Sequence, residues 1–262
     1  MKLQTVLEEL SERARERGSE ASAATMTLVV FFEDATIGAL ARDRIRTLAA
    51  KHPSRVILLD GTQDETMQRV ERNDWIELGV ENSGAEVLQS AANALRLPEA
   101  PVVLLWIAPG IGDDERFVAL SHGARTVVYN SSLVDVGHRA LEELIEYVER
   151  HPDLPIADIA YLRLGPWQES VAILFDGEEA AELLDLARVE ITCGSEPESL
   201  YLLGWLASRL GWKPRSADSF AAPSGRSVRF ALRREGEPRR ILRVALRSAR
   251  STFVAEMNES GE

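Results

Sequence analysis

The stretch TLVVFFEDATIGALARD, residues 27–43, decides the fold of this chain. Its first six residues are apolar or β-branched, which predicts a buried strand over Thr27–Phe32. A helical pattern follows over Ile37–Ala50, and the next apolar run, RVILL at Arg55–Leu59, predicts a second strand. Continuously apolar strands separated by helices are typical of a mostly parallel sheet with helices on both faces.

The same alternation continues to Arg150 and predicts a single α/β domain. One strand departs from it, because DWIELGV at Asp74–Val80 alternates apolar and polar residues and so predicts a half-exposed, antiparallel edge strand. The remaining predicted elements are a helix, a strand, a short helix, a strand and a helix, at Gly84–Arg96, Val102–Ile107, Arg116–Ser121, Thr126–Tyr129 and Val136–Arg150.

A smaller α+β domain is predicted after Pro155. Proline suits the first turn of a helix, so Gly165-Pro166 predicts a helix that runs through Trp167 to Phe175. A strand region is predicted over Leu183–Cys193, and a helix over Ser199–Leu210 ends at Gly211 as a C-terminal cap. We therefore divide the chain into an N-terminal amphipathic helix and linker, an α/β domain and a C-terminal α+β domain, at 1–24, 25–153 and 154–262.

The C-terminal region alternates apolar residues with arginines. This period of two predicts a β-hairpin that turns at Glu235–Pro238, with an apolar inner face and an arginine-rich outer face. Between Arg226 and Arg250 the chain has only two acidic residues but nine arginines, which are Arg226, Arg229, Arg233, Arg234, Arg239, Arg240, Arg243, Arg247 and Arg250.

Arginine pairs with carboxylates and phosphates and is enriched at interfaces. Three interpretations of the arginines stay open: a dock for an acidic partner surface, a phosphate site, or a solvated strand face balanced by acids elsewhere. Trp167 is either a core residue or a half-exposed interface anchor. The candidate partner-binding residues are Trp167, Arg229, Arg233, Arg243 and Arg247.

The composition argues against several classes of protein. A net charge of −12 over 262 residues disfavours binding to nucleic acid or to an anionic membrane. The longest apolar run, Pro101–Ala108, is far shorter than the roughly 20 residues that span a bilayer. Cys193 is the only cysteine, so no intrachain disulfide can form, and we expect it to be buried and inert. A soluble, cytoplasmic protein is predicted.

Local signatures of catalysis are missing from the sequence. It has no GxGxxG, GxxxxGK, HExxH or GxSxG motif, and the acids of APGIGDDE at Ala108–Glu115 would repel phosphate. We therefore predict no catalytic residue, no metal ligand and no cofactor. Loops at the carboxyl ends of parallel strands form the default ligand crevice of such a domain. An alternative function is therefore a sensor of, or an enzyme acting on, a sugar phosphate or nucleotide near Asp34, Asp60 and Gly110.

Four pieces of the sequence, in order along the chain, resemble the glucose-6-phosphate dehydrogenase assembly protein family, OpcA. They are HPSRVILL at His52–Leu59, APVVLLW at Ala100–Trp106, RLGPWQ at Arg163–Gln168 and LLGWLASRLGW at Leu202–Trp212. The resemblance implies a non-catalytic activator that binds glucose-6-phosphate dehydrogenase, the first enzyme of the oxidative pentose phosphate pathway, and favours its active oligomer. It implies no catalytic residues and no cofactor.

Overall fold

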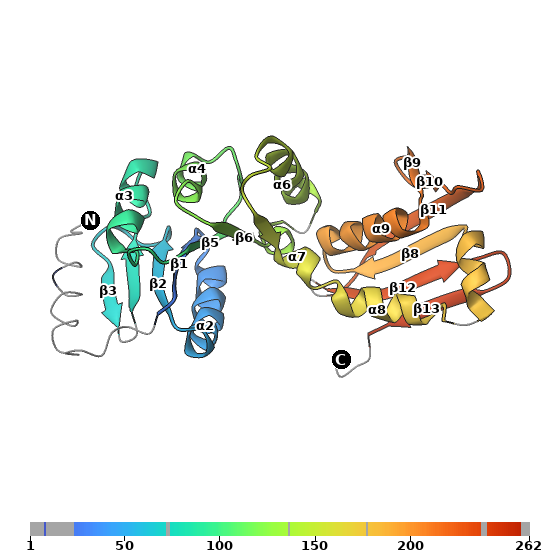
Figure 1. Cartoon of the computed structure of the whole chain (residues 1–262), viewed down its shortest axis with the longest axis horizontal. Coiled ribbons are helices and arrows are strands. Elements are labelled where there is room, and N and C mark those ends of the chain that lie inside the picture. Colours follow the sequence, from blue (N-terminus) through green and yellow to red (C-terminus); the bar gives the residue numbers. More distant parts are fainter. Residues whose placement is uncertain are drawn as a thin grey trace. The chain divides into compact units, whose positions relative to one another are not determined.

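The computed structural model of the chain describes residues 8, 24–71, 74–135, 137–176, 178–236 and 240–257 (Figure 1). The amphipathic helix predicted over residues 1–24 lies almost entirely outside this part. The chain forms two compact units, one of residues up to Asn130 with Glu142–Ala157, the other of Ser131–Leu141 with Asp158–Glu262. Of the described helices, none is long and apolar enough to cross a membrane.

A seven-stranded sheet forms the centre of the first unit, in the order β3-β4-β2-β1-β5-β6-β7. The pairs of β1 with β2 and β5, of β2 with β4 and of β5 with β6 are parallel. The strands are β1 (Met26–Phe32), β2 (Ser54–Asp60), β3 (Gln68–Glu71), β4 (Trp75–Gly79), β5 (Val102–Ile107), β6 (Thr126–Tyr129) and β7 (Ile156–Asp158).

Helices flank this sheet, as the sequence predicts. Helix α2 (Ala35–Lys51) packs on β1 and β2, while α3 (Ala85–Leu95) and α4 (Glu115–Ser121) pack against each other on the opposite face (Figure 1). Helix α6 (Arg139–Arg150) leads toward β7. The predicted parallel-dominated α/β architecture is therefore confirmed.

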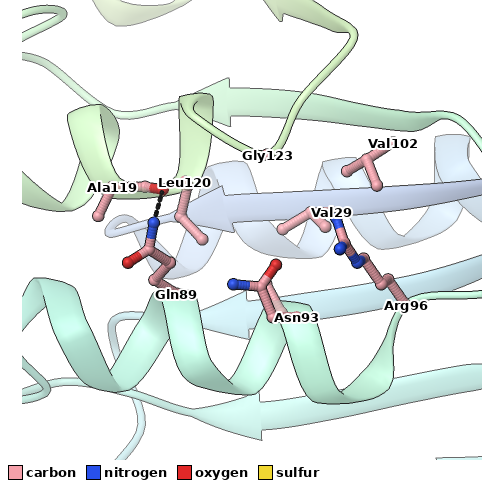
Figure 2. A pocket seen from close by; sticks show the side chains of 9 residues that line it. Val29, Gln89, Asn93, Arg96, Val102, Ala119, Leu120 and Gly123 are labelled. Atoms are coloured by element: carbon pink, nitrogen blue, oxygen red, sulfur yellow. Dashed lines mark hydrogen bonds between the residues drawn. The ribbon is translucent and has the colours of Figure 1, made fainter.

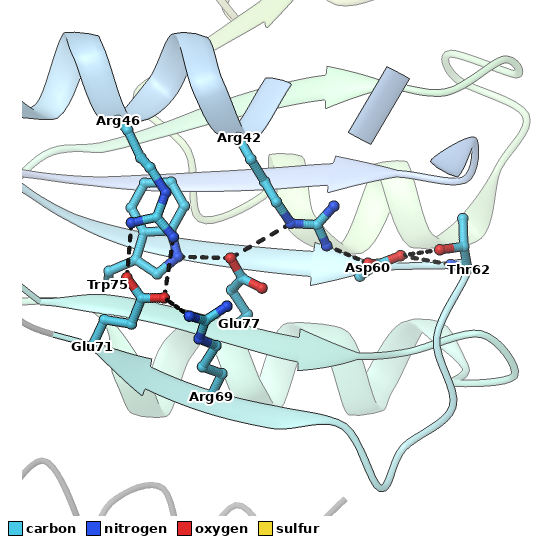
Figure 3. Close-up of polar contacts among 8 residues, drawn as sticks. All are labelled: Arg42, Arg46, Asp60, Thr62, Arg69, Glu71, Trp75 and Glu77. Carbon is cyan, nitrogen blue, oxygen red and sulfur yellow. Dashed lines mark hydrogen bonds and ion pairs between the residues drawn. The ribbon is translucent and has the colours of Figure 1, made fainter. Parts of the chain in front are cut away.

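The prediction for Asp74–Val80 is wrong. All five residues of β4 are buried, β4 runs parallel to β2, and the antiparallel edge strand is β3. The polar residue of the alternating pattern, Glu77, accepts a hydrogen bond of 2.8 Å from Trp75 Nε1 and lies 3.5 Å from Arg42 Nε (Figure 3). Glu77 therefore has partners inside the protein and does not mark a solvent-facing side of the strand.

The second unit contains a six-stranded sheet in the order β13-β12-β8-β11-β10-β9. Helices α8 (Gly165–Ile173) and α9 (Glu196–Leu210) pack on it, α9 against β8 and β11 and α8 against β13. Segments α5 (Ser131–Val134), α7 (Ile159–Leu162) and the 3-10 helix η1 (Glu178–Asp185) complete it. Its strands are β8 (Arg188–Cys193), β9 (Lys213–Ser216), β10 (Ser219–Ala221), β11 (Ser227–Arg234), β12 (Ile241–Arg247) and β13 (Thr252–Glu256).

The predicted hairpin has the right strands and the wrong pairing. Strand β8 lies between β11 and β12, parallel to β11 and antiparallel to β12. The unit does end in a β-hairpin, but it is made of β12 and β13. The strand region predicted over Leu183–Cys193 begins only at Arg188, because the preceding residues form η1.

Two buried carboxylates tie the helical segments of this unit together. Asp158 caps α7 at Ala160 N (2.9 Å) and accepts hydrogen bonds from Ser131 N (3.1 Å), Ser131 Oγ (2.6 Å) and Tyr201 OH (3.0 Å). Glu198, only 4% exposed, lies 3.3 Å from Arg163 Nη1. Since buried charges are stable only with partners, these contacts fix α5, α7 and the first turn of α9 to one another.

Replacing Glu198 with glutamine should make the protein more stable at neutral pH but not at acidic pH. Burial raises the pKa of Glu198, and the charge of Asp158 adds to the shift although Arg163 opposes it. When the pKa of a glutamate is raised in the folded state, its protonated form stabilises the fold at a pH below the ordinary glutamate pKa. This contribution is lost as the pH rises through the pKa of the folded state. The glutamine amide does not titrate. The unfolding free energy of Glu198→Gln should therefore exceed that of the parent protein by on the order of 1 kcal/mol at neutral pH.

The measurement is the free energy of urea unfolding of both proteins between pH 4 and pH 8. The exposed Glu169→Gln variant on α8 serves as the control, and its difference from the parent protein should not vary over this range. If the difference in unfolding free energy between Glu198→Gln and the parent protein stays constant with pH, burial does not raise the pKa of Glu198.

Candidate partner-binding surface

The arginines predicted on one hairpin face instead lie on the outer face of a mixed sheet. The strand registers place Arg229 of β11 beside Arg188 of β8, and Arg188 beside Arg247 of β12. Two residues further along β8, Glu190 lies between Ala231 and Ala245. The next row holds Arg233, Thr192 and Arg243, and Glu256 of β13 completes it. We call this surface, which comprises residues 188, 190, 192, 229, 231, 233, 243, 245, 247 and 256, the arginine face.

Glu190 is the centre of the arginine face and its most buried charge, at 6% exposure. Its carboxylate oxygens lie 2.6 Å from Arg188 Nη2, 3.1 Å from Arg247 Nη2 and 3.7 Å from Arg233 Nη2. The small neighbours Ala231 and Ala245 leave room for these guanidinium groups to bend inward. One carboxylate thus holds three cations in place.

Among the described residues, the ion pairs of the arginine face engage only some of its guanidinium N–H groups. Each guanidinium carries five N–H donors, and these arginine side chains remain between 38% and 59% exposed where an ion pair is formed. Arg243 Nε lies 3.9 Å from Glu256, a weak contact. The face carries five arginines against two carboxylates, so it is cationic within a chain of net charge −12.

Not every arginine of the sequence pattern belongs to this face. Arg226 bonds to Asp185, and Arg234 pairs with Glu196 at 2.6 Å. Arg239 lies outside the described residues.

Trp167, the other candidate partner-binding residue, is half-buried against the core that α8, α9 and the inner sheet face form.

Sequence reasoning missed Arg188 and Glu190. The signal was available, because RVEITC at Arg188–Cys193 alternates charged or polar residues with buried Val189, Ile191 and Cys193. What no local pattern revealed was the place of this strand between the two arginine-bearing ones.

The turn after β1 matches the spacing of a dinucleotide-binding loop without its chemistry. In the pattern GxGxxG, the first two glycine positions hold Glu33 and Ala35, and the third holds Gly38. A Cβ on Gly38 would lie 2.4 Å from the ring of Phe32, so this glycine allows close packing of α2 on β1. Asp34 caps α2 by accepting a hydrogen bond of 2.8 Å from Ile37 N, and thus places a carboxylate where a phosphate would bind.

The same end of the sheet is closed by ion pairs. Arg116 Nη1 lies 2.6 Å from Glu33 Oε1, and its Nη2 lies 2.5 Å from Asp114 Oδ2. Hydrogen bonds to Asp114 and Glu33 raise the pKa of Arg116. Burial opposes ionisation of Asp114, but the bonds from Arg116 prevail and lower the pKa of this carboxyl. The Arg116 guanidinium is therefore already paired with two acids.

Asp60, at the end of β2, occupies the place where dinucleotide-binding domains carry a ribose-binding acid. Here it is 1% exposed, pairs with Arg42, and accepts bonds from Thr62 N (2.8 Å) and Thr62 Oγ1 (2.6 Å) (Figure 3). Nearer the start of β2 and β4, Arg46 stacks over Trp75 at 4.3 Å and bonds to Glu71. Gly110 forms a turn with a φ of 79° and accepts a hydrogen bond from Asp114 N.

A hollow in this unit lies elsewhere, between α3 and α4. Gln89, Asn93 and Arg96 line its polar side, and Val29 and Leu120 its apolar side (Figure 2). Its volume is about 20 Å³, which is room for about one water molecule. Among the described residues, no group of three or more His, Cys, Asp or Glu side chains is arranged to hold a metal ion.

The C-terminal part of the chain matches a known protein family. Residues 154–260 match the family described as the C-terminal domain of the glucose-6-phosphate dehydrogenase subunit. The chain is 29% identical over 190 residues to the OxPP cycle protein OpcA of Synechocystis sp., covering 65% of this chain and 40% of that protein. For OpcA of Nostoc punctiforme the identity is 32% over 146 residues, or 55% and 31% of the two chains. The chain thus spans less than half the length of these relatives.

Solved structures share the fold at low sequence identity. An oxidoreductase from Sinorhizobium meliloti gives a TM-score of 0.51 at 12% identity, covering 88% of this chain and 72% of that one. An oxidoreductase domain protein from Kribbella flavida also gives 0.51, at 10% identity and with 89% and 74% covered. At such identity the likeness concerns the fold alone. The family and sequence matches confirm the resemblance that the four pieces of sequence predict.

Proposed function

Because the chain is related to the OpcA proteins, we propose that it acts in the oxidative pentose phosphate pathway as a non-catalytic partner of glucose-6-phosphate dehydrogenase. In this role it binds the enzyme in the bacterial cytoplasm and favours its active oligomer. The observation that carries the proposal is the match of residues 154–260 to a domain family named for a subunit of this enzyme. The turn after β1 supports it as well, since Asp34 caps α2 and Glu33 pairs with Arg116, so that two acids stand in the segment where a phosphate-binding loop carries glycines.

The mechanism of such a factor is thermodynamic linkage. A protein that binds the assembled enzyme more tightly than its separate subunits shifts the equilibrium toward assembly. Each tenfold preference corresponds to about 1.4 kcal/mol. No bond needs to be made or broken, and no catalytic group is required of this chain.

We place the interface on the C-terminal unit, with Arg229, Arg233, Arg243 and Arg247 as its charged part. A specific interface buries about 800 Å² per partner, which exceeds a patch three residues long on four strands. Helix α8 lies on the inner side of the sheet and is a separate candidate contact, because Trp167 is half-buried and Ile173 is 60% exposed. Aromatic and arginine side chains are both enriched among interaction hot spots.

The test uses the purified chain and glucose-6-phosphate dehydrogenase from the same cells. We expect the two to co-elute in size-exclusion chromatography. We also expect added chain to raise the dehydrogenase activity when the enzyme is dilute enough to dissociate, and to have no effect when it is concentrated. Absence of both effects would refute the proposal. Thermal stabilisation of the isolated chain by glucose 6-phosphate or NADP would instead support the alternative of a small-molecule sensor.

A further inference from the structure

We infer that Glu190 is a resident counter-ion that competes with the carboxylates of an acidic partner protein for the arginine face. This inference rests on the proposed function and adds the chemistry of the partner surface. The occupant to which the face is fitted is an acidic protein surface, and under the proposed function it belongs to glucose-6-phosphate dehydrogenase. The argument starts from the position of one buried acid among three arginines.

The arrangement of these side chains resembles a carboxylate-binding site that the chain itself has filled. Arg188, Arg233 and Arg247 come from three different strands, and their guanidinium groups converge on the Glu190 carboxylate. Arginine is suited to this role because its planar donors match the geometry of a carboxylate. The pairing holds the three long side chains in position before any partner arrives, which reduces the entropy lost on binding.

A second copy of this chain is a poor occupant of the face. In a two-fold symmetric contact the same patch meets itself, so arginine rows would face arginine rows. With five arginines against two carboxylates on each copy, both sides of such a contact would be cationic. Like charges brought together in this way disfavour the complex.

A free phosphate or a nucleic acid fits less well than an acidic protein. The Glu190 carboxylate lies at the centre of the face and would repel a phosphate at that point. The overall charge of −12 repels a long polyanion. A folded partner can instead place separate carboxylates over the outer guanidinium groups, Arg229 and Arg243, on either side of Glu190.

The association rate is the quantity that separates this role from a structural one. Side-chain preorganisation acts mainly on dissociation, whereas the net charge of a docking face acts on the rate of encounter at low salt. Glu190→Gln keeps the shape of the side chain and removes one negative charge from the face. It should raise the association rate roughly two- to threefold, and Arg229→Glu with Arg233→Glu should lower it about tenfold or more.

The experiment measures association of each variant with immobilised glucose-6-phosphate dehydrogenase by interferometry at low and high salt. The matched control is Arg44→Glu with Arg209→Glu. It changes the net charge by the same amount as Arg229→Glu with Arg233→Glu, but at exposed helix positions outside the arginine face. Circular dichroism checks that each variant is folded. Arg229→Gln with Arg233→Gln is the milder second variant, expected to lower the rate less than the double glutamate.

The outcomes distinguish this inference from the proposed function. Opposite changes for Glu190→Gln and the double glutamate variant, both reduced at high salt, support it. If the parent protein binds the enzyme but both variants behave like the control, the inference fails and the proposed function stands. If the parent protein does not bind, both fail. Self-association of the parent protein that the double glutamate variant abolishes overturns the inference, because the face then pairs with its own copy.

Discussion

Replacing Trp106 with alanine is expected to lower the free energy of unfolding of the α/β unit by about 3–5 kcal/mol. Trp106 lies at the end of β5 and is fully buried. Its ring stacks on Phe31 with centroids 4.4 Å apart and meets Phe117 edge to face at 5.2 Å. Truncation would remove both aromatic contacts and leave a cavity at the point where β1, β5 and α4 meet.

The matched variant is Trp106→Phe, which keeps an aromatic ring at this position. The indole Nε1 is buried and has no hydrogen-bond partner among the described residues, so phenylalanine removes no hydrogen bond. Its cost should therefore be well below that of alanine, about 1–2 kcal/mol, and should come from volume alone. Urea unfolding followed by far-ultraviolet circular dichroism measures both values. Equal losses for the two variants would contradict this account of the aromatic cluster.

The second large effect is expected for Asp158→Ala, a loss of about 3–5 kcal/mol in the stability of the C-terminal unit. Four hydrogen bonds end on this carboxylate, two from backbone N–H groups and two from the hydroxyls of Ser131 and Tyr201. Alanine would leave the buried N–H groups of Ser131 and Ala160 and the Ser131 hydroxyl without this acceptor and would also remove the cap of α7.

Two variants give this prediction its scale. Tyr201→Phe deletes a single one of the four donors and should cost about 1 kcal/mol. Asp185→Ala, at a carboxylate whose side chain is 56% exposed, should change the unfolding free energy by less than about 0.5 kcal/mol. The three are compared by urea unfolding at neutral pH. A loss for Asp158→Ala no larger than that for Tyr201→Phe would mean that water replaces the missing acceptor.

The alternation of apolar and charged residues was enough to predict the strands of the arginine face, but not their neighbours. Consecutive strands pair in most proteins, which favoured a hairpin of β11 and β12. In the structure, β8 pairs with both of them, although α9, β9 and β10 separate it from β11 in sequence. Pairing over such a distance depends on how the apolar faces pack together, which no local pattern records.

In the segment after β1, too, the sequence predicted which residue types are present but not which side chains meet. Missing glycines in EDATIG predicted that no phosphate loop follows β1. That Asp60 would be tied to Arg42, and Glu33 to Arg116, depends on side chains brought together from different elements. Likewise, Glu77 appeared to mark an exposed strand, because the sequence did not show that Trp75 and Arg42 would meet it.

Gly38, in the first turn of helix α2, is required for a reason unrelated to any ligand, since the adjoining ring of Phe32 leaves no space for a methyl group. At this position the packing of the fold therefore needs a glycine even without a bound phosphate. Of the three glycines of the GxGxxG pattern, only this one is present. Searches that depend on the complete fingerprint will overlook domains of this kind. The strand order, combined with one tightly packed glycine, would recover them.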